Sequence, residues 1–105
     1  MRTINLSVVL PAFNEERRIG STLDGIYNYL RAQNFEFEIV LVDDGSRDNT
    51  VLIAESWAHD TDVLRILKLP HKGKGFAVKE GMMRARGNLR LMFDVDMSMP
   101  VEYIE

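Results

Sequence analysis

Short apolar runs alternate with longer amphipathic segments along this chain. Each run is four to eight residues of mainly Val, Ile, Leu and Phe, which is typical of buried strands. They are nearly continuous in hydrophobicity rather than alternating, as expected for strands covered on both faces. The predicted strands are residues 5–11, 37–42, 63–69 and 89–93.

The segments between these runs have helical periodicity. In residues 15–32, Ile19, Leu23, Ile26 and Leu30 follow one another at spacings of four, three and four, which places them on one face of a helix. Two further helices are predicted at residues 46–58 and 75–85.

Polar residues mark the expected helix ends. Glu15 and Glu16 fall in the first turn of the first helix, where the helix dipole favours anions. Ser46 and Asp48 are capping candidates for the second helix, and Gly87 is a candidate stop for the third.

The alternation predicts an α/β fold with a Rossmann-like parallel sheet and helices on both faces. Right-handed crossovers bring the carboxyl ends of all strands to one edge, where open parallel sheets bind ligands. A polar, acidic or glycine-rich cluster follows every strand: residues 11–16, 43–46, 71–75 and 94–96. The sequence therefore predicts one ligand site at this edge.

Size and composition set the remaining limits. The chain has 105 residues, enough for one domain at most, and 46% hydrophobic content, enough for a modest core. It has no cysteine, which excludes disulfides and thiolate metal sites. No apolar run approaches the roughly 20 residues of a membrane span, and no signal peptide is visible. The expected location is cytoplasmic.

The net charge of −3 is unevenly spread. Residues 65–90 carry eight basic side chains and one acidic side chain, whereas acidic residues predominate on both flanks. Two interpretations remain open: a solvated helix face, or local attraction for a polyphosphate. The acidic flanks disfavour a nucleic-acid surface.

Asp94 and Asp96 lie where the last apolar run ends. Side chains two apart in a strand point the same way, so these carboxylates form a hard oxygen site for Mg²⁺ or Mn²⁺. Such a metal takes other ligands from water and substrate phosphate, which favours a phosphorylated substrate.

These motifs together resemble the family 2 inverting glycosyltransferases of the GT-A fold. The resemblance rests on Pro-Ala-Phe-Asn-Glu-Glu, then Val-Asp-Asp-Gly-Ser-x-Asp-x-Thr, then Lys-Gly-Lys-Gly and Asp-x-Asp, and covers essentially the whole chain. Residues 73–82 and 96–100 carry a finer likeness to polyprenyl- and dolichyl-phosphate glucosyl- and mannosyltransferases. Residues 1–105 then correspond to the N-terminal, nucleotide-binding half of a GT-A domain.

The resemblance implies a role for each cluster. The nucleoside would be bordered by Pro11, Ala12, Phe13 and Glu15. Asp43 would accept a hydrogen bond from the base, and Asp44 would shape the loop beside it. Lys74 offers a point charge to the diphosphate, Asp94 would hold the ribose or a metal-bound water, and Asp96 would bind the metal. Relatives often carry asparagine at the position of His71, whose role stays open.

The implied activity is inverting transfer from a UDP-glucose or GDP-mannose type donor to a polyprenyl (dolichyl) phosphate, with Mg²⁺ or Mn²⁺. The general base of such enzymes lies well beyond the Asp-x-Asp, so no catalytic residue is assigned within this chain, and we expect donor binding without transfer. The full-length protein would associate with the cytoplasmic side of a membrane. An uncovered sheet edge would favour homo-oligomers.

Other classes of protein fit less well. A phosphoacceptor receiver domain would share the acidic pair Asp43–Asp44, but a strand and a helix precede that pair here. A dinucleotide-binding oxidoreductase would need Gly-x-Gly-x-x-Gly after the first strand, and residues 11–16 contain no glycine. Residues 73–75 lack the Gly-Lys-Ser/Thr ending of a P-loop. A fragment that serves only for interaction, without activity, is the remaining alternative.

Overall fold

A four-stranded parallel sheet forms the centre of the computed structural model, which describes residues 4–33 and 36–95. The strand order is β3-β2-β1-β4, so the chain reverses its direction of travel across the sheet between β3 and β4. The strands are β1 (Leu6–Ala12), β2 (Phe37–Asp43), β3 (Leu64–Lys68) and β4 (Leu89–Met92). The central strands β1 and β2 are buried along their whole length, which explains their continuous hydrophobicity.

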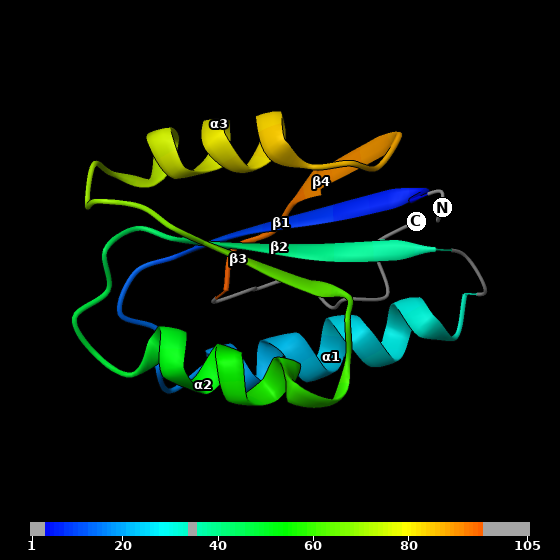
Figure 1. Cartoon of the computed structure of the whole chain (residues 1–105), viewed down its shortest axis with the longest axis horizontal. Helices are drawn as coiled ribbons and strands as arrows, with labels where there is room; N and C mark the ends of the chain where they lie inside the picture. The colour runs from blue at the N-terminus through cyan, green and yellow to red at the C-terminus, as the bar shows by residue number, and fades with distance from the viewer. Residues whose placement is uncertain (1–3, 34–35, 96–105) are drawn as a thin grey trace.

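Helices cover both faces of this sheet (Figure 1). Helices α1 and α2 pack side by side on one face, and α3 lies on the other face over β1 and β2. The bounds are α1 (Ile19–Arg31), α2 (Thr50–Trp57), a 3-10 turn η1 (Ala58–Asp60) and α3 (Lys74–Arg84). The predicted fold class is confirmed.

Two apolar layers hold the helices to the sheet. The larger one joins strand residues such as Leu10 and Leu41 to the α1 residues Leu23 and Ile26, all fully buried. The smaller layer lies between α3 and the sheet and consists mainly of small side chains, and Gly81 packs directly against the sheet. A β-carbon at Gly81 would lie 2.5 Å from Val9 Cγ1, so glycine sets the close approach of α3.

The first two helices begin later than predicted. Glu15–Arg18 form a turn ahead of α1, and the first turn of α1 has no acidic residue, so the expected dipole contact is wrong. Helix α2 begins at Thr50 with Asn49 at its N-cap, rather than with Ser46. Both departures have one cause. The residues before α1 and the residues before α2 form hydrogen bonds with each other, as described below.

Gly87 serves a different purpose from the predicted helix stop. Helix α3 ends at Arg84, and Gly87 is buried against β1. A β-carbon there would lie 2.7 Å from the backbone nitrogen of Ser7. Glycine is therefore required for the chain to pass β1 before it enters β4.

A buried carboxylate lies on the α3 side of the sheet. Glu38 is 4% exposed, and its Oε2 accepts hydrogen bonds from Ser7 Oγ and Arg86 N, both at 2.6 Å. Gly87 N donates to Ser7 Oγ at 2.8 Å. Arg65 Nε lies 3.3 Å from Glu38 Oε1 and forms an ion pair with it, without the angle of a hydrogen bond. This network joins β1, β2, β3 and the end of α3.

Within the described residues, no helix has the length and apolar character needed to cross a bilayer.

Candidate functional site

A pocket opens at the carboxyl edge of the sheet, where the loops after β1, β2 and β3 meet at the left of Figure 1. Its volume is about 350 Å³, within the range of small-molecule sites. Its lining comes from all four strand ends: Pro11, Ala12, Phe13, Glu15, Asp44, His71, Gly73, Lys74, Asp94 and Val95.

Reciprocal hydrogen bonds clamp the β1–α1 loop to the β2–α2 loop. Asn14 adopts a left-handed φ of 54°, which short polar side chains tolerate. Its backbone N–H donates to Ser46 Oγ, and its Oδ1 accepts from Arg47 N, both at 2.8 Å. The loop that carries Phe13 is thereby held against the loop that follows Asp43.

The clamp continues at the next residues. Glu15 N donates to Thr50 Oγ1 at 2.8 Å, Glu16 N donates to Asp48 Oδ2 at 3.2 Å, and Asn49 N donates to Glu16 Oε1 at 3.1 Å. Burial raises the pKa of Asp48, but the bonds from the Thr50 hydroxyl and from backbone N–H groups outweigh it and hold the pKa below its ordinary value. The side chains and backbone of the Asn-Glu-Glu and Ser-x-Asp-x-Thr motifs thus stabilise the two loops that contain them.

Asp44 organises the loop between β3 and α3. Its side chain is buried, and its Oδ1 accepts from Lys72 N at 2.9 Å. Gly73 N lies 3.1 Å from Oδ2, and His71 Nδ1 lies 2.8 Å from the same oxygen. The Asp44 carboxylate thus holds the backbone of this loop and the ring of His71.

His71 connects three loops at the mouth of the pocket. Its ring stacks on Phe13 with centroids 4.2 Å apart and planes 18° from parallel. Its Nδ1 faces both the carboxylate and the backbone carbonyl of Asp44, two groups that only accept, so Nδ1 carries the proton. The ring therefore fixes the position of Phe13 relative to the β3–α3 loop.

Asp43 lies behind the pocket rather than in its lining. The residue is 4% exposed, and its Oδ2 accepts from Ser46 N at 2.9 Å. Its other oxygen, Oδ1, is buried and has no hydrogen-bond partner among residues 4–33 and 36–95. Such an acceptor is rare in folded proteins and calls for a donor from elsewhere.

Lys74 and Asp94 form an ion pair in the pocket lining. Both side chains stay half-exposed, so both can exchange this contact for one with a ligand. Among the described residues, no three His, Asp or Glu side chains gather into a metal cage. Asp96, the predicted metal ligand, lies outside the described residues.

The structure thus brings seven predicted residues to one pocket: Pro11, Ala12, Phe13, Glu15, Asp44, Lys74 and Asp94. The sequence interpretation left His71 without a role, although its place after the third strand was a usable signal. It also missed the clamp, because that depends on contacts between loops far apart in sequence.

This arrangement defines an open α/β domain with a pocket at the carboxyl ends of its strands, the edge where such domains bind ligands. Residues 7–105 match the glycosyl transferase family 2. The chain therefore belongs to that family. This membership excludes the receiver-domain alternative.

Three comparisons illustrate the similarity. A dolichyl-phosphate beta-glucosyltransferase of Drosophila melanogaster is 40% identical over 102 residues, which is 90% of this chain and 31% of the relative. The mannosyltransferase PcManGT of Pyrobaculum calidifontis, solved with GDP-Man and Mn²⁺, superposes with a TM-score of 0.77 at 29% identity over 91% of this chain and 28% of its own. Staphylococcus aureus TarS 1-349, solved with UDP-GlcNAc, gives 0.73 at 32% identity over 89% and 27%. The chain thus spans about a third of these proteins.

Proposed function

We propose that this chain binds the sugar donor of an inverting glycosyltransferase that moves a sugar from a nucleoside diphosphate to a polyprenyl phosphate such as dolichyl phosphate. The observation that carries the proposal is the pocket, which combines an aromatic ring, an ammonium group and a carboxylate at one sheet edge. A nucleotide-sugar needs each of these: a surface for its nucleoside, a cation for its diphosphate, and an oxygen ligand for the accompanying metal.

The nucleoside end rests on Phe13 and Asp43. Phe13 is 38% exposed and offers its ring to the base or ribose. The unpartnered Oδ1 of Asp43 would accept an N–H from the base, which satisfies an acceptor that is otherwise costly to bury. We favour UDP over GDP from this contact and from the glucosyltransferase relative.

The diphosphate end rests on Lys74, Asp94 and Asp96. The carboxylate oxygen of Asp94 in the pocket lining fits Mg²⁺ or Mn²⁺, which bind few protein carboxylates and take further ligands from phosphate. Asp96 would hold the metal, and Asp94 would hold the ribose or a metal-bound water. A bound metal would neutralise charge on the departing nucleoside diphosphate. Lys74 would leave Asp94 and contact the diphosphate directly, which stabilises the same charge.

The polyprenyl phosphate acceptor is proposed for the whole protein from its similarity to the Drosophila relative. The whole protein would then meet its acceptor at the cytoplasmic side of a membrane. We assign no residue of this chain as the general base. Of the described aspartates in the pocket lining, Asp44 is bonded to the β3–α3 loop, and Asp94 is assigned to the donor and metal side.

Calorimetry tests donor binding. UDP and GDP are titrated with and without Mn²⁺, and we expect metal-dependent binding with UDP preferred. Asp96→Ala should abolish the metal dependence, and Asp94→Ala should weaken it less. Asp62→Ala, which changes an aspartate far from the pocket lining, is the charge-matched control. Binding of NADH or ATP in place of UDP and GDP would overturn the proposal.

Lys74→Ala should weaken binding of UDP by about 1 to 3 kcal/mol through loss of a charge-assisted contact. Uridine, which has no diphosphate, should bind the variant and the parent alike. Lys79→Ala removes the same charge from the outer side of α3 and is the matched control. Equal losses for UDP and uridine would move Lys74 away from the phosphates.

A further inference from the structure

The proposed donor site does not account for the basic segment at residues 65–90. Of its eight basic side chains, only Lys74 lines the pocket. Arg65 turns inward to Glu38, and Lys68 reaches α2 and pairs with Glu55 at 3.3 Å. The pocket thus contains one cation of this segment, and five others lie outside it.

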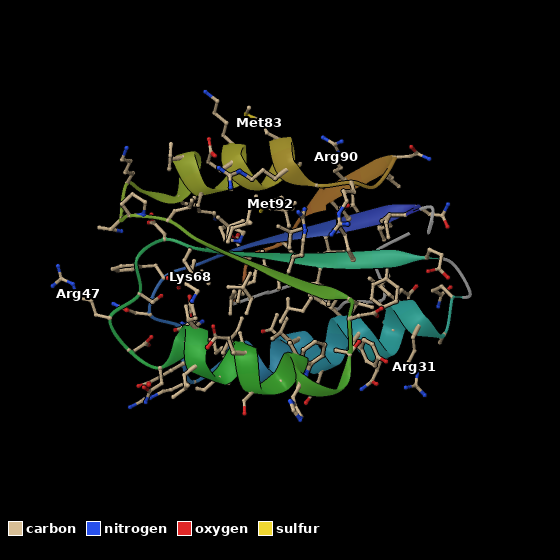
Figure 2. The ribbon with its side chains drawn as sticks, in the orientation of Figure 1. Arg31, Arg47, Lys68, Met83, Arg90 and Met92 are labelled. Carbon is tan, nitrogen blue, oxygen red and sulfur yellow. The ribbon has the colours of Figure 1, made fainter. Side chains whose placement is uncertain are left out.

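These five cations lie on one side of the molecule. We call this side the basic face. Its members belong to α3 and its flanking loops, or to β4 on the side of the sheet that α3 covers: Lys72, Lys79, Met83, Arg84, Arg86, Arg90 and Met92. Helix α3 presents Lys79 and Met83 to solvent, because its buried positions Ala77 and Gly81 face the sheet, and Arg84 is exposed as the last residue of the helix. Figure 2 shows Met83 and Arg90 directed away from the sheet on the α3 side, whereas Arg31 projects from α1 on the other side.

Local contacts hold several of these cations without removing their charge. Arg90 donates to the backbone carbonyls of Met82 and Gly87, at 2.6 and 3.1 Å, which are neutral partners. Lys72 lies over the Phe76 ring. On this face, only Arg84 and Arg86 have carboxylate partners among the described residues, Glu80 and Glu38. The face therefore stays strongly positive.

Exposed methionines lie among the cations. Met83 is 66% exposed and Met92 is 40% exposed, which puts both among the few exposed large apolar side chains in the described part of the chain. Met92 pairs in register with Val9, whose side chain lies on the α3 face of the sheet. Apolar side chains within a cationic surface are typical of elements that lie in the interface of an anionic membrane.

The negative net charge of the chain does not oppose such binding. The molecule measures 35 × 27 × 25 Å, and its acidic residues are concentrated in the segments that carry α1 and α2. At physiological ionic strength the screening length is about 8 Å. A charged surface that approaches α3 therefore interacts mainly with the charges on the α3 side of the molecule.

We propose that the basic face binds the surface of an anionic lipid bilayer. Lipid headgroups supply the negative charge, and the methionines enter the apolar boundary beneath them. A nucleic acid would use the charge but not the methionines, and the one aromatic ring here, Phe76, is half-buried beneath Lys72. The inference does not depend on nucleotide binding.

This binding would also orient the pocket. Helix α3 begins at Lys74, which lines the pocket. When the protein lies with α3 against the bilayer, the pocket is therefore at the edge of the contact area. An acceptor phosphate at the lipid surface would reach the pocket from the side.

Vesicle co-sedimentation of the whole chain tests the proposal. Vesicles of phosphatidylcholine alone are compared with vesicles that contain about 30% phosphatidylglycerol, at low and high salt. We expect binding to the anionic vesicles only, weakened by salt. Lys79→Glu combined with Met83→Ser should lower the partition coefficient at least about fivefold.

The matched control is Arg31→Glu combined with Leu52→Ser. It makes the same change in charge and removes one exposed apolar side chain from the α1 and α2 side, and its binding should equal that of the parent. Circular dichroism checks the fold of both variants. Failure of the parent to bind anionic vesicles, equal losses in both variants, or tighter binding to duplex DNA than to vesicles would each overturn the proposal. UDP titration of the same variants separates this result from the donor site.

Discussion

Replacement of Glu38 by alanine is expected to lower the free energy of unfolding by about 3 to 5 kcal/mol, which is much of the stability of a domain this size. The carboxylate is the acceptor for Ser7 Oγ and Arg86 N and the ion-pair partner of Arg65. Its loss leaves these groups at a buried site without their acceptor. The effect should exceed that of any exposed ion pair in the chain.

Urea denaturation followed by circular dichroism measures this difference. Glu55→Ala is the internal control, because Glu55 pairs with Lys68 at a similar distance of 3.3 Å but both side chains are well exposed. An exposed pair contributes only about 0 to 1 kcal/mol. Equal destabilisation by the two substitutions would show that the buried network contributes no more than a surface contact.

Replacement of Asp44 by alanine is expected to weaken UDP binding at least about tenfold, although we do not expect this side chain to contact the nucleotide. Its carboxylate holds the backbone of Lys72 and Gly73 and the ring of His71. Without it, the loop loses the conformation that sets the start of α3 and therefore the position of Lys74. Asp44→Asn keeps one acceptor oxygen and should bind UDP with intermediate affinity.

Calorimetry with UDP and Mn²⁺ measures these affinities, and circular dichroism verifies that the variants fold. Asp24→Ala removes an exposed carboxylate of α1 that is not part of the pocket lining and whose partner is the Trp57 ring nitrogen, and this variant should bind UDP like the parent. An Asp44→Ala variant with unchanged affinity would mean that the loop is held by other contacts.

The architecture could be predicted from the sequence because local signals agreed with tertiary ones. The apolar runs of β1 and β2 are buried over their whole length, and the period of Ile19, Leu23 and Ile26 is the core face of α1. Helix starts could not be predicted in the same way. Glu15 and Ser46 have good local propensity for a first turn and a cap, but bonds to the opposite loop outweigh that propensity.

The site was predictable to the extent that it depends on strand order. Loops after parallel strands converge at one edge, so the sequence alone assigns Phe13, Asp44 and Lys74 to one site. The stacking of His71 on Phe13 could not, because it depends on side-chain orientation across loops 58 residues apart in the chain. The purpose of Gly87 was missed for the same reason, since its constraint is the backbone of Ser7.

The loop clamp has a consequence for how the protein folds. Its hydrogen bonds join residues 32 to 35 apart in sequence, and those of Asp44 to the third loop join residues 27 to 29 apart. Each such contact requires closure of a long chain segment, and its entropic cost is met only after β1 and β2 have paired. The pocket is therefore assembled late, after the sheet. In hydrogen exchange of the native protein, the amides of Asn14, Glu15 and Arg47 should be protected together and exchange as one cooperative unit, although all three lie in loops.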